Sequence, residues 1–388
     1  MSQSGQAGGP ERSAGRQDSG AKLTVGFLFG GRSGEHEVSL ISARSVMQAA
    51  DPGKYRVVPV GITKDGIWRT PAVDGPPEPD RAFGPESVEV ALWGAPGFRG
   101  LVRLSDPAGG GPCGWSRSPI DAIFPVLHGT FGEDGTVQGL IEMAGLPYVG
   151  SGVLASSVGM DKHIAKRLFA QAGLPQVGWR MIPANRWRRE PEAVMKEIAD
   201  AFAWPFFVKP ANLGSSVGIS KVHEQREIAP ALDLAASYDE KILVEEGVPA
   251  REIECAVLGN DEPEASVPGE IVPCKEFYDY EAKYLMEGSK LLIPAPVDAP
   301  TAREVQRIAI AAFQAVDASG LARVDFFLHK STGKIYLNEV NTMPGFTKIS
   351  MYPKMWEASG LPYPRLIDRL IALGLSRHDE RARLRRSR

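Results

Sequence analysis

Short apolar runs alternate with helical patterns through the first part of the chain. Residues 22–29 (KLTVGFLF), 55–62 (YRVVPVGI) and 121–129 (DAIFPVLHG) are continuous apolar runs, which is typical of strands buried on both faces of a sheet. A polar glycine loop and a helical segment follow the first run, and the same order follows the third. This alternation predicts an α/β domain with an open parallel sheet over residues 22–150. The Pro- and Gly-rich residues 71–119 are expected to form loops around one short strand.

The pattern changes after this domain. Residues 151–248 combine helical segments with apolar strands around a glycine loop (PFFVKPANLGSSVGISKV), which predicts a small α+β domain. Residues 249–375 hold two strands, a long amphipathic helix (TAREVQRIAIAAFQAVDASG) and a hairpin made of LARVDFFLHK and GKIYLNEVN. The helix is expected to begin with a capping box of Thr301 and Glu304 and to stop at Gly320.

Composition and charge exclude several classes of protein. Hydrophobic residues make up 43% of the chain and charged residues 23%, and the formal net charge is −3, whereas nucleic-acid binders normally carry a basic excess. No apolar run approaches the roughly 18–20 residues that span a bilayer. The three scattered cysteines, Cys113, Cys255 and Cys274, argue against a disulfide framework. We therefore expect a cytoplasmic protein with no nucleic-acid partner and no membrane partner.

Both ends of the sequence are polar. Residues 1–21 have no apolar segment of the kind found in signal peptides, so they are interpreted as a disordered tail. Residues 376–388 are rich in arginine. We expect this Arg-rich tail to be a frayed, solvated helix end, and binding to nucleic acid or to a membrane surface is the alternative.

The segment GSSVG (214–218) is compatible with two functions. It fits the nucleophile pattern G-x-S-x-G, with Ser216 as the nucleophile of a serine hydrolase, but that geometry needs a strand before the serine and a helix after it. Strand-like sequences flank the segment on both sides, so we expect the tip of a hairpin. Its backbone N–H groups, the hydroxyls of Ser215 and Ser216 and the ammonium of Lys209 could then bind a phosphate chain. An exposed polar hairpin is the alternative.

The last predicted hairpin carries a candidate metal site. A five-residue loop would place Asp325 opposite Glu339 and Arg323 opposite Asn341. Like charges directly opposite each other destabilise a strand pair unless a cation compensates, and two carboxylates with an amide oxygen suit Mg²⁺ that bridges phosphates. Strand alternation places Leu337 on the same face, which favours a partly buried site. The alternative is a carboxylate satisfied by Arg323 on a solvated face.

Two loops follow strands of the predicted parallel sheet. GGRSGEHE contains Glu35 and His36, and LHGTFGEDG contains His128. Ligands of open α/β sheets bind outside the carboxyl ends of the strands, so these side chains are candidates for a binding site. A glutamate at a helix N-terminus can instead be a partner of the helix dipole, and a histidine at a strand end can be structural.

Seven segments occur in the order found in one enzyme family: GGRSGEHEVSL, LHGTFGEDGTVQG, GMDKHIAK, VKPANLGSSVGISKV, FYDYEAKY, ARVDFFL and NEVNTMPGFTKISMYPKMW. Over about residues 22–375 the chain resembles the D-alanine–D-alanine ligases of the ATP-grasp superfamily. The resemblance implies a three-domain ATP-grasp fold of the α/β and α+β classes. It also implies a cytoplasmic homodimer that uses ATP and two Mg²⁺ ions, with Mn²⁺ as an alternative, to join two D-alanine molecules for peptidoglycan.

The resemblance further implies roles for individual residues. Residues that would bind ATP, with Glu252 at the ribose, are Lys162, Lys209, Ser215, Glu245, Glu246, Val248 and Glu252. The implied Mg²⁺ ligands are Asp325, Glu339 and Asn341. Residues implied to act on the first D-alanine are Glu35, which meets its ammonium and is held by Ser216 and Tyr284, together with His128 and Arg323 near its carboxylate. The second D-alanine is implied to bind near Ser350 and Met351, and the mobile active-site loop of the family corresponds to the segment with Tyr278, Lys283 and Tyr284.

The implied reaction passes through an acyl phosphate, which the amine of the second D-alanine attacks. Arg323 and the backbone of residues 345–346 are candidate donors to the oxyanion, and no residue is assigned as the base that deprotonates the amine. The EAKY sequence ending at Tyr284 favours a dipeptide product over D-alanyl-D-lactate. Three alternatives remain: an ATP-grasp ligase with another amine, a serine hydrolase that uses Ser216, and a nucleotide-binding module without catalysis.

Overall fold

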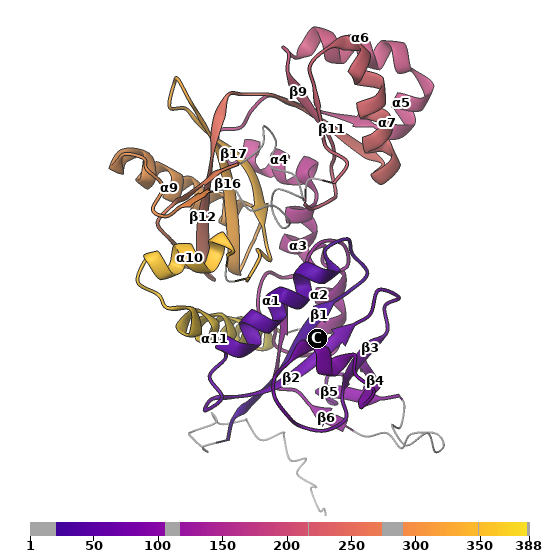
Figure 1. The fold of residues 1–388 in the computed structure, drawn as a ribbon, viewed down its shortest axis with the longest axis vertical. Helices are drawn as coiled ribbons and strands as arrows, with labels where there is room; N and C mark the ends of the chain where they lie inside the picture. The colour runs from indigo at the N-terminus through magenta and orange to yellow at the C-terminus, as the bar shows by residue number, and fades with distance from the viewer. Residues whose placement is uncertain (1–20, 105–116, 216, 274–289, 348, 386–388) are drawn as a thin grey trace, which may run out of the picture.

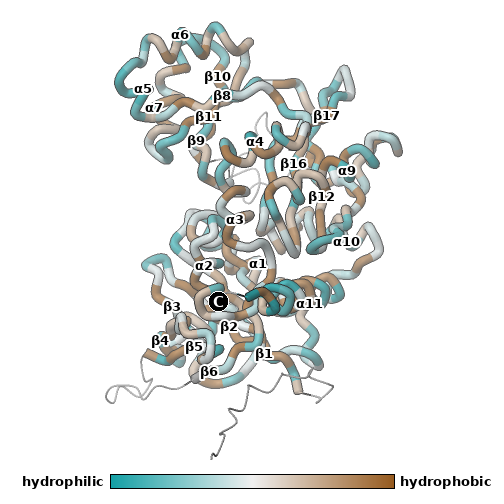
Figure 2. The backbone as a smooth tube through the Cα atoms, turned by 180° about the vertical axis from the view of Figure 1, so that it is seen from behind, coloured by the Kyte–Doolittle hydropathy of each residue, from teal (hydrophilic) through white to brown (hydrophobic). Residues whose placement is uncertain are grey.

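The computed structural model describes residues 21–104, 117–215, 217–273, 290–347 and 349–385. These residues form three sheets with helices packed against them (Figure 1). Within them, no helix is both long enough and apolar enough to cross a membrane. The outer helices are instead amphipathic, and Figure 2 shows hydrophilic and hydrophobic positions alternating along them.

The first sheet has seven strands in the order β6-β5-β4-β3-β2-β1-β7. Strand β1 is parallel to both β2 and β7, as the apolar runs predicted. The segment 71–119 extends this parallel centre with antiparallel strands instead of loops, so the complete sheet is mixed. Its elements are β1 (Leu23–Gly30), α1 (His36–Ala49), β2 (Tyr55–Ile62), β3 (Trp68–Pro71), η1 (Pro79–Ala82), β4 (Ser87–Leu92), β5 (Gly100–Arg103), β6 (Arg117–Pro119), β7 (Ala122–Pro125) and α2 (Thr136–Met143).

The second sheet is antiparallel, with the strand order β10-β9-β11-β8. Three helices cover one of its faces, and their apolar side chains join a core with residues such as Val208 and Val244. The other face is left for the binding site described below. Its elements are β8 (Trp179–Pro183), α5 (Ala184–Arg189), α6 (Pro191–Ala201), β9 (Phe206–Pro210), β10 (Ser220–Val222), η2 (Gln225–Glu227), α7 (Ile228–Tyr238) and β11 (Lys241–Glu246).

The third sheet follows the order β15-β14-β12-β16-β17, with β13 paired to β12. Helices α3, α4 and α9 pack into one core with β12, β16 and β17, so the first helices after the N-terminal sheet belong to this core. Its elements are α3 (Val153–Met160), α4 (Lys162–Gln171), β12 (Ala250–Gly259), β13 (Glu264–Ala265), β14 (Gly269–Val272), β15 (Lys290–Leu292), α9 (Ala299–Ala315), β16 (Gly320–His329), β17 (Ile335–Asn341), α10 (Met351–Ala358) and α11 (Tyr363–Ala382).

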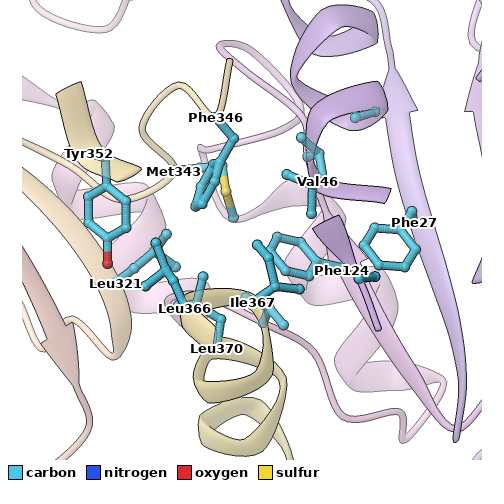
Figure 3. Packing of buried hydrophobic residues seen from close by; sticks show 14 of the residues in the cluster. Phe27, Val46, Phe124, Leu321, Met343, Phe346, Tyr352, Leu366, Ile367 and Leu370 are labelled. Carbon is cyan, nitrogen blue, oxygen red and sulfur yellow. The ribbon is translucent and has the colours of Figure 1, made fainter. Parts of the chain in front are cut away.

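A continuous apolar cluster joins the N-terminal sheet to the C-terminal part of the chain (Figure 3). Phe27 and Phe124 come from the first sheet, and Phe346 stacks edge-on against Phe124 with ring centroids 6.1 Å apart. Leu366 and Leu370 of α11 fill the space between the two parts. Because this core is shared, the N-terminal and C-terminal loops that carry the polar candidates are held against each other.

Three predictions about the third sheet were wrong. Helix α9 ends at Ala315, and Gly320 is instead the first residue of β16. The carboxylate of Asp298, not a capping box at Thr301, accepts a hydrogen bond from the Thr301 N–H at 2.8 Å and caps α9. In β17, Leu337 does not share a face with Glu339. A bulge shifts the register between Asp325 and Phe326, so Leu337 and Val340 are both buried although three positions apart. The extra residue returns Leu337 to the apolar core and leaves Glu339 on the other face.

The Arg-rich end is also more ordered than expected. Helix α11 continues to Ala382, so it includes Arg377 and Arg381. The guanidinium of Arg377 lies 4.4 Å from the centroid of the Tyr148 ring, and Arg381 forms an ion pair with Glu142. The prediction of a frayed, solvated helix end was therefore wrong for this stretch. Packing and hydrogen bonds against the N-terminal sheet hold the last turns in place.

Candidate active site

Two glycine loops enclose Glu35, which stands at the N-terminal end of α1. Ser215 donates its hydroxyl hydrogen to Oε1 of Glu35. A Cβ atom added to Gly129 or Gly214 would lie 2.7 or 2.9 Å from Oε2 of Glu35, so a larger residue in either loop would displace this carboxylate. Ser215 itself adopts a φ of 50°, a left-handed conformation that is uncommon outside glycine and is often found at functional sites.

The loop with Ser215 lies between the antiparallel strands β9 and β10. A serine nucleophile of the G-x-S-x-G type needs a helix after the serine, so the hydrolase interpretation of Ser216 loses its structural basis. The sequence assigned the contact with Glu35 to Ser216 and placed Ser215 with the phosphates. The structure gives this contact to Ser215. Four expected site residues lie outside the described part of the chain: Ser216, Tyr278, Lys283 and Tyr284.

His128 is buried between the N-terminal and C-terminal loops. Its Nδ1 lies 3.2 Å from the carbonyl oxygen of Met343, and its Nε2 lies 3.0 Å from the hydroxyl of Ser42. Burial lowers the pKa of His128, although the negative charge of Glu35 opposes the shift. The neutral ring donates from Nδ1 to the carbonyl and accepts at Nε2 from the hydroxyl. His128 therefore connects the end of the first sheet to the segment after β17.

Glu133 is a site residue that the sequence did not single out. Its carboxylate accepts hydrogen bonds from the N–H of Gly129 at 2.7 Å and from the N–H of Met343 at 3.2 Å. Burial, together with the charge of Glu35, raises the pKa of Glu133 to about 8. The only signal in the sequence was its place in the loop LHGTFGEDG, where it is indistinguishable from a solvated acid.

The hairpin of β16 and β17 has the predicted register at its polar end. Asp325 lies opposite Glu339 and Arg323 lies opposite Asn341. Arg323 binds Asp325 through two hydrogen bonds of 2.7 Å, and Asn341 donates to the same carboxylate at 3.0 Å. The sequence missed Glu254, a buried acid on β12 that lies 3.1 Å from Nε of Arg323.

Arg323 is a single positive charge beside two acids, Asp325 and Glu254. Burial opposes its charge, but Asp325 and Glu254 together raise the pKa of Arg323 well above its ordinary value. The guanidinium is thus permanently charged, and two acids fix it: Asp325 on the same strand and Glu254 on β12. Its field reaches the N-terminal loops, since it contributes to lowering the pKa of His128. Arg323, His128 and Glu35 therefore belong to one electrostatic neighbourhood.

Lys162 connects the glycine hairpin with the acidic hairpin. It is the first residue of α4, after the N-cap Asp161. Its Nζ donates to the carbonyl oxygen of Leu213 at 2.6 Å and lies 3.7 Å from Oε2 of Glu339. The lysine, the backbone of the glycine loop and the carboxylate of Glu339 therefore line one space. This arrangement could hold a phosphate chain with its counter-cation.

Three buried charged side chains, Lys166, Lys209 and Glu245, form a charge triad on the face of the second sheet that α5, α6 and α7 do not cover. Lys209 and Glu245 point away from the helices, because alternation directs their neighbours Val208 and Val244 into the helical core. Glu245 forms ion pairs with Lys209 and with Lys166 of α4, the latter at 2.6 Å. Burial opposes the charge of Glu245, but the two ammonium groups lower its pKa to about 2. The sequence gave no sign of Lys166, which is 1% exposed.

The remaining nucleotide candidates line the connection from β11 to β12. Glu246 is exposed, and its Oε2 accepts a hydrogen bond from the N–H of Gly178 at 3.1 Å. Val248 lies in the turn that follows, and Glu252 lies on β12 opposite Phe327 of β16. The turn passes directly from the second sheet to the third. These residues therefore stand at the junction between the lysine-bearing sheet and the acidic hairpin.

Ser350 and Met351 open α10, but their side chains behave differently. The hydroxyl of Ser350 accepts a hydrogen bond from the N–H of Thr347 at 3.0 Å and lies 2.8 Å from its hydroxyl. A Cβ on Gly345 would lie 2.8 Å from the same hydroxyl. Met351 is 5% exposed and packs in the apolar cluster shared with the N-terminal sheet. Ser350 thus fixes the shape of the loop after β17, while Met351 anchors it.

Comparison with known proteins follows the same division of the chain. The family model described as "D-ala D-ala ligase N-terminus" matches residues 24–151, and "D-ala D-ala ligase C-terminus" matches residues 168–372. The chain is 51% identical over 364 residues to the D-alanine–D-alanine ligase of Heliobacterium modesticaldum, covering 93% of this chain and 97% of the relative. It is 50% identical over 372 residues to the D-alanine–D-alanine ligase of Acetivibrio thermocellus, with 93% and 98% covered.

Solved structures give the same result. The D-alanine–D-alanine ligase from Coxiella burnetii has a TM-score of 0.80 and 37% sequence identity, with 93% of this chain and 96% of that chain covered. The VanG D-Ala:D-Ser ligase from Enterococcus faecalis also has a TM-score of 0.80, with 36% identity and 91% and 100% covered. The same fold therefore occurs in ligases whose names give different second substrates.

Proposed function

Because this chain belongs to the D-alanine–D-alanine ligase family, we propose that it joins two D-alanine molecules into D-alanyl-D-alanine, with hydrolysis of ATP to ADP and phosphate. The observation that carries this proposal is the placement of opposite charges in one neighbourhood, since Glu35 and Arg323 both act on the buried His128. Glu35 is held by Ser215 on one side, and Arg323 is held by Asp325 and Glu254 on another. A carboxylate and a guanidinium so placed match the ammonium and carboxylate of an amino acid.

ATP is assigned to the space between the second and third sheets. Its phosphates would lie along the glycine loop with Lys162, Lys209 and Ser215, where backbone N–H groups and ammonium groups offset their charge. Glu245 and Glu246 end β11 at the start of β9, opposite Phe207 and Phe206, and so lie at the end of the sheet away from this loop. Val248 and Glu252 follow them. Residues proposed to contact the base and ribose are Glu245, Glu246, Val248 and Glu252.

The acidic hairpin fits the divalent cation that such a reaction needs. Asp325, Glu339 and Asn341 offer hard oxygen atoms on adjacent positions of paired strands. Mg²⁺ in such sites usually keeps waters and substrate phosphates among its ligands. Two Mg²⁺ ions, or Mn²⁺ in their place, would neutralise phosphate charge there.

The residues of this chain then have separable tasks. A carboxylate is a poor electrophile, so the first D-alanine is activated as an acyl phosphate. Glu35 holds its ammonium, and Arg323 faces the reacting carboxyl group with His128 nearby. The amine of the second D-alanine attacks from the side of Ser350 and Met351, and the developing oxyanion is stabilised by Arg323 and by the N–H groups of residues 345–346. We further propose a cytoplasmic homodimer that supplies peptidoglycan synthesis.

The decisive experiment compares ADP release with D-alanine and with L-alanine, in the presence of ATP and Mg²⁺. We expect release only with D-alanine, together with the dipeptide as product. Release without dependence on D-alanine, or equal release with both enantiomers, would refute the assignment. Binding of ATP without any ADP release would instead support the nucleotide-binding module. Labelling by an active-site serine probe would support the hydrolase.

A second candidate is a mixed ligase, because one similar structure is a D-Ala:D-Ser ligase. Competition at neutral pH between D-alanine, D-serine and D-lactate as second substrate distinguishes the two. We expect D-alanyl-D-alanine as the main product. A majority of D-alanyl-D-serine or of D-alanyl-D-lactate would move the proposal to the other amine or hydroxyl acceptor.

A further inference from the structure

Arg377, near the end of α11, joins three separate parts of the chain. Its guanidinium donates hydrogen bonds to the carbonyl oxygen of Gly150, to the carbonyl oxygen of Tyr148 at 3.3 Å and to the hydroxyl of Ser319 at 2.9 Å. It also lies over the Tyr148 ring. Tyr148 and Gly150 end the N-terminal sheet region, whereas Ser319 directly precedes β16. The planar fork of arginine is suited to bind several acceptors at once.

The backbone at this junction is closely packed. A Cβ on Gly320 would lie 3.1 Å from Cα of Gly150, and both glycines have positive φ, +78° and +96°. Ser151 and Ser319 exchange hydrogen bonds of 3.3 Å in both directions. The N–H of Gly320 donates to Oδ1 of Asn260 at 3.2 Å. The start of β16 is therefore fixed against the N-terminal sheet by contacts that larger residues would disrupt.

This junction lies at the base of the strand that carries the reacting groups. Arg323 and Asp325 follow Gly320 on β16, at roughly 10 and 16 Å along an extended strand. The second strand of the same hairpin is attached at this end too, through Met343, which contacts His128 and Glu133. The open end of the hairpin of β16 and β17 is thus held to the N-terminal sheet on both of its strands, and Arg377 holds the β16 side.

The cavity beside Arg377 is too small for a substrate. It has a volume of about 50 Å³ and is also lined by Glu142, His378 and Arg381, which is room for a few water molecules. Arg381, one helical turn further, pairs with Glu142 at 3.1 Å. The side chain of Arg381 is 44% exposed. This region therefore attaches α11 to the segments around it. Of the two arginines, Arg377 binds the segment that leads into β16, whereas Arg381 binds Glu142.

We propose that Arg377 is a positioning residue that sets Arg323 and Asp325 at the correct distance from Glu35 and His128. This proposal rests on the proposed ligase function, because it assigns the placement of groups in the same site. A displacement of about 1 Å at reacting groups can lower a rate on the order of a hundredfold. Loss of Arg377 should therefore reduce kcat, whereas binding of ATP in the absence of Mg²⁺, which relies on Lys162, Lys209 and the glycine loop, should be retained.

The test compares Arg377→Met with Arg381→Met as the matched control. For Arg377→Met we expect a kcat for D-alanine-dependent ADP release that is lower by roughly ten- to a hundredfold. The dissociation constant for ATP, measured without D-alanine and without Mg²⁺, should change less than about twofold, and backbone amides 319–323 should exchange hydrogen faster. Arg381→Met should keep kcat within about twofold, and Arg377→Lys, which retains the charge, should restore part of the loss.

Two outcomes would overturn the proposal: a folded Arg377→Met enzyme with kcat within about twofold of the unmodified protein, or an equal loss in Arg381→Met. If Arg377→Met does not fold, Ser319→Ala removes one acceptor of the same guanidinium and decides by the same measurements, with a fall of about two- to fivefold expected. Absence of any D-alanine-dependent ADP release in the unmodified protein would refute the proposed function instead. The hydrogen exchange of amides 319–323 would then still test the attachment.

Discussion

Ser215 donates its hydroxyl hydrogen to Glu35, a residue 180 positions earlier in the chain. This contact joins the hairpin of the second sheet to the N-terminal end of α1. Both partners stand in glycine loops, and the acceptor carboxylate is within reach of the Gly129 loop as well. The glycine loop after β9 is therefore held to the N-terminal end of α1 by this hydrogen bond. Its removal should affect substrate binding more than folding.

Glu35→Gln tests this contact. The amide retains the shape of the side chain and one acceptor oxygen, but it loses the charge that would bind an ammonium group. A hydrogen bond to a charged group contributes about 1.5–3 kcal/mol, so kcat/KM for D-alanine should fall by roughly ten- to a hundredfold. Glu37→Gln is the control, since Glu37 pairs with Lys64 at the surface. If steady-state kinetics give the same kcat/KM for D-alanine in both variants, Glu35 is not a residue of the substrate site.

Glu339→Gln tests the acidic hairpin. An amide keeps the size of the side chain and an oxygen ligand but loses the negative charge that a carboxylate offers Mg²⁺, and even outer partners of metal ligands contribute 10–100-fold. D-alanine-dependent ADP release should therefore fall by about a hundredfold or more. The midpoint of thermal unfolding should stay close to that of the unmodified protein, because the amide keeps the size of the side chain and Nζ of Lys162 lies 3.7 Å from the carboxylate.

The control for this variant is Glu264→Gln, an exposed acid on the same sheet that pairs with Arg369. It should keep full turnover over a titration of Mg²⁺. Retained turnover in Glu339→Gln at every Mg²⁺ concentration would show that this carboxylate is not a ligand. A loss that higher Mg²⁺ restores would agree with the assignment.

The register of the hairpin of β16 and β17 could be predicted from the sequence, because alternation and loop length determine which residues face each other. Asp325 and Glu339 accordingly lie opposite each other. The bulge could not be predicted in this way. The bulge lets Leu337 and Val340 both reach the apolar core. The burial of both side chains can be recognised only after α4 and α9 are packed against the strand.

The sequence pattern also could not identify ion-pair partners that are far apart in the chain. A lysine in an amphipathic helix is normally solvated, and Lys166 is recognised as buried only when Glu245 is placed beside it. Glu254 is recognised in the same way beside Arg323. Arg377 was interpreted as part of a solvated tail for the same reason. Burial of a charge depends on its partner, and the partner is supplied by the fold.

Lys166→Met tests the buried triad. The variant leaves Glu245 with Lys209 as a partner, and removal of one member of a buried ion pair typically costs roughly 3–5 kcal/mol. We expect lower stability in urea unfolding and weaker binding of ATP. Lys196→Met, at an exposed position of α6, is the control and should change neither.

The acid limb of stability should move as well in Lys166→Met. The pKa of Glu245 is lowered to about 2, so its contribution is complete above the ordinary value near 4.5 and is lost as pH falls toward 2. Without Lys166 the pKa of Glu245 rises, and acid unfolding should begin at higher pH. Equal acid-unfolding curves for the variant and the unmodified protein would show that Lys166 does not stabilise the charge of Glu245.

Glu133→Gln tests the second enclosed acid through pH. Its pKa of about 8 lies above the ordinary 4.5, so the folded state binds a proton that the unfolded state has released between these values. Stability conferred by the protonated carboxyl is therefore lost as pH rises from about 4.5 to 8. The amide does not titrate, so the unfolding temperature of Glu133→Gln minus that of the unmodified protein should increase over this interval and level off above pH 8.

His128 is present in both proteins, so its own titration cancels in the difference. Glu86→Gln, at an exposed position, should give a difference that does not vary with pH. Parallel curves for Glu133→Gln from pH 5 to 9 would show that Glu133 is ionised throughout, and its place beside Glu35 would then require a compensating cation.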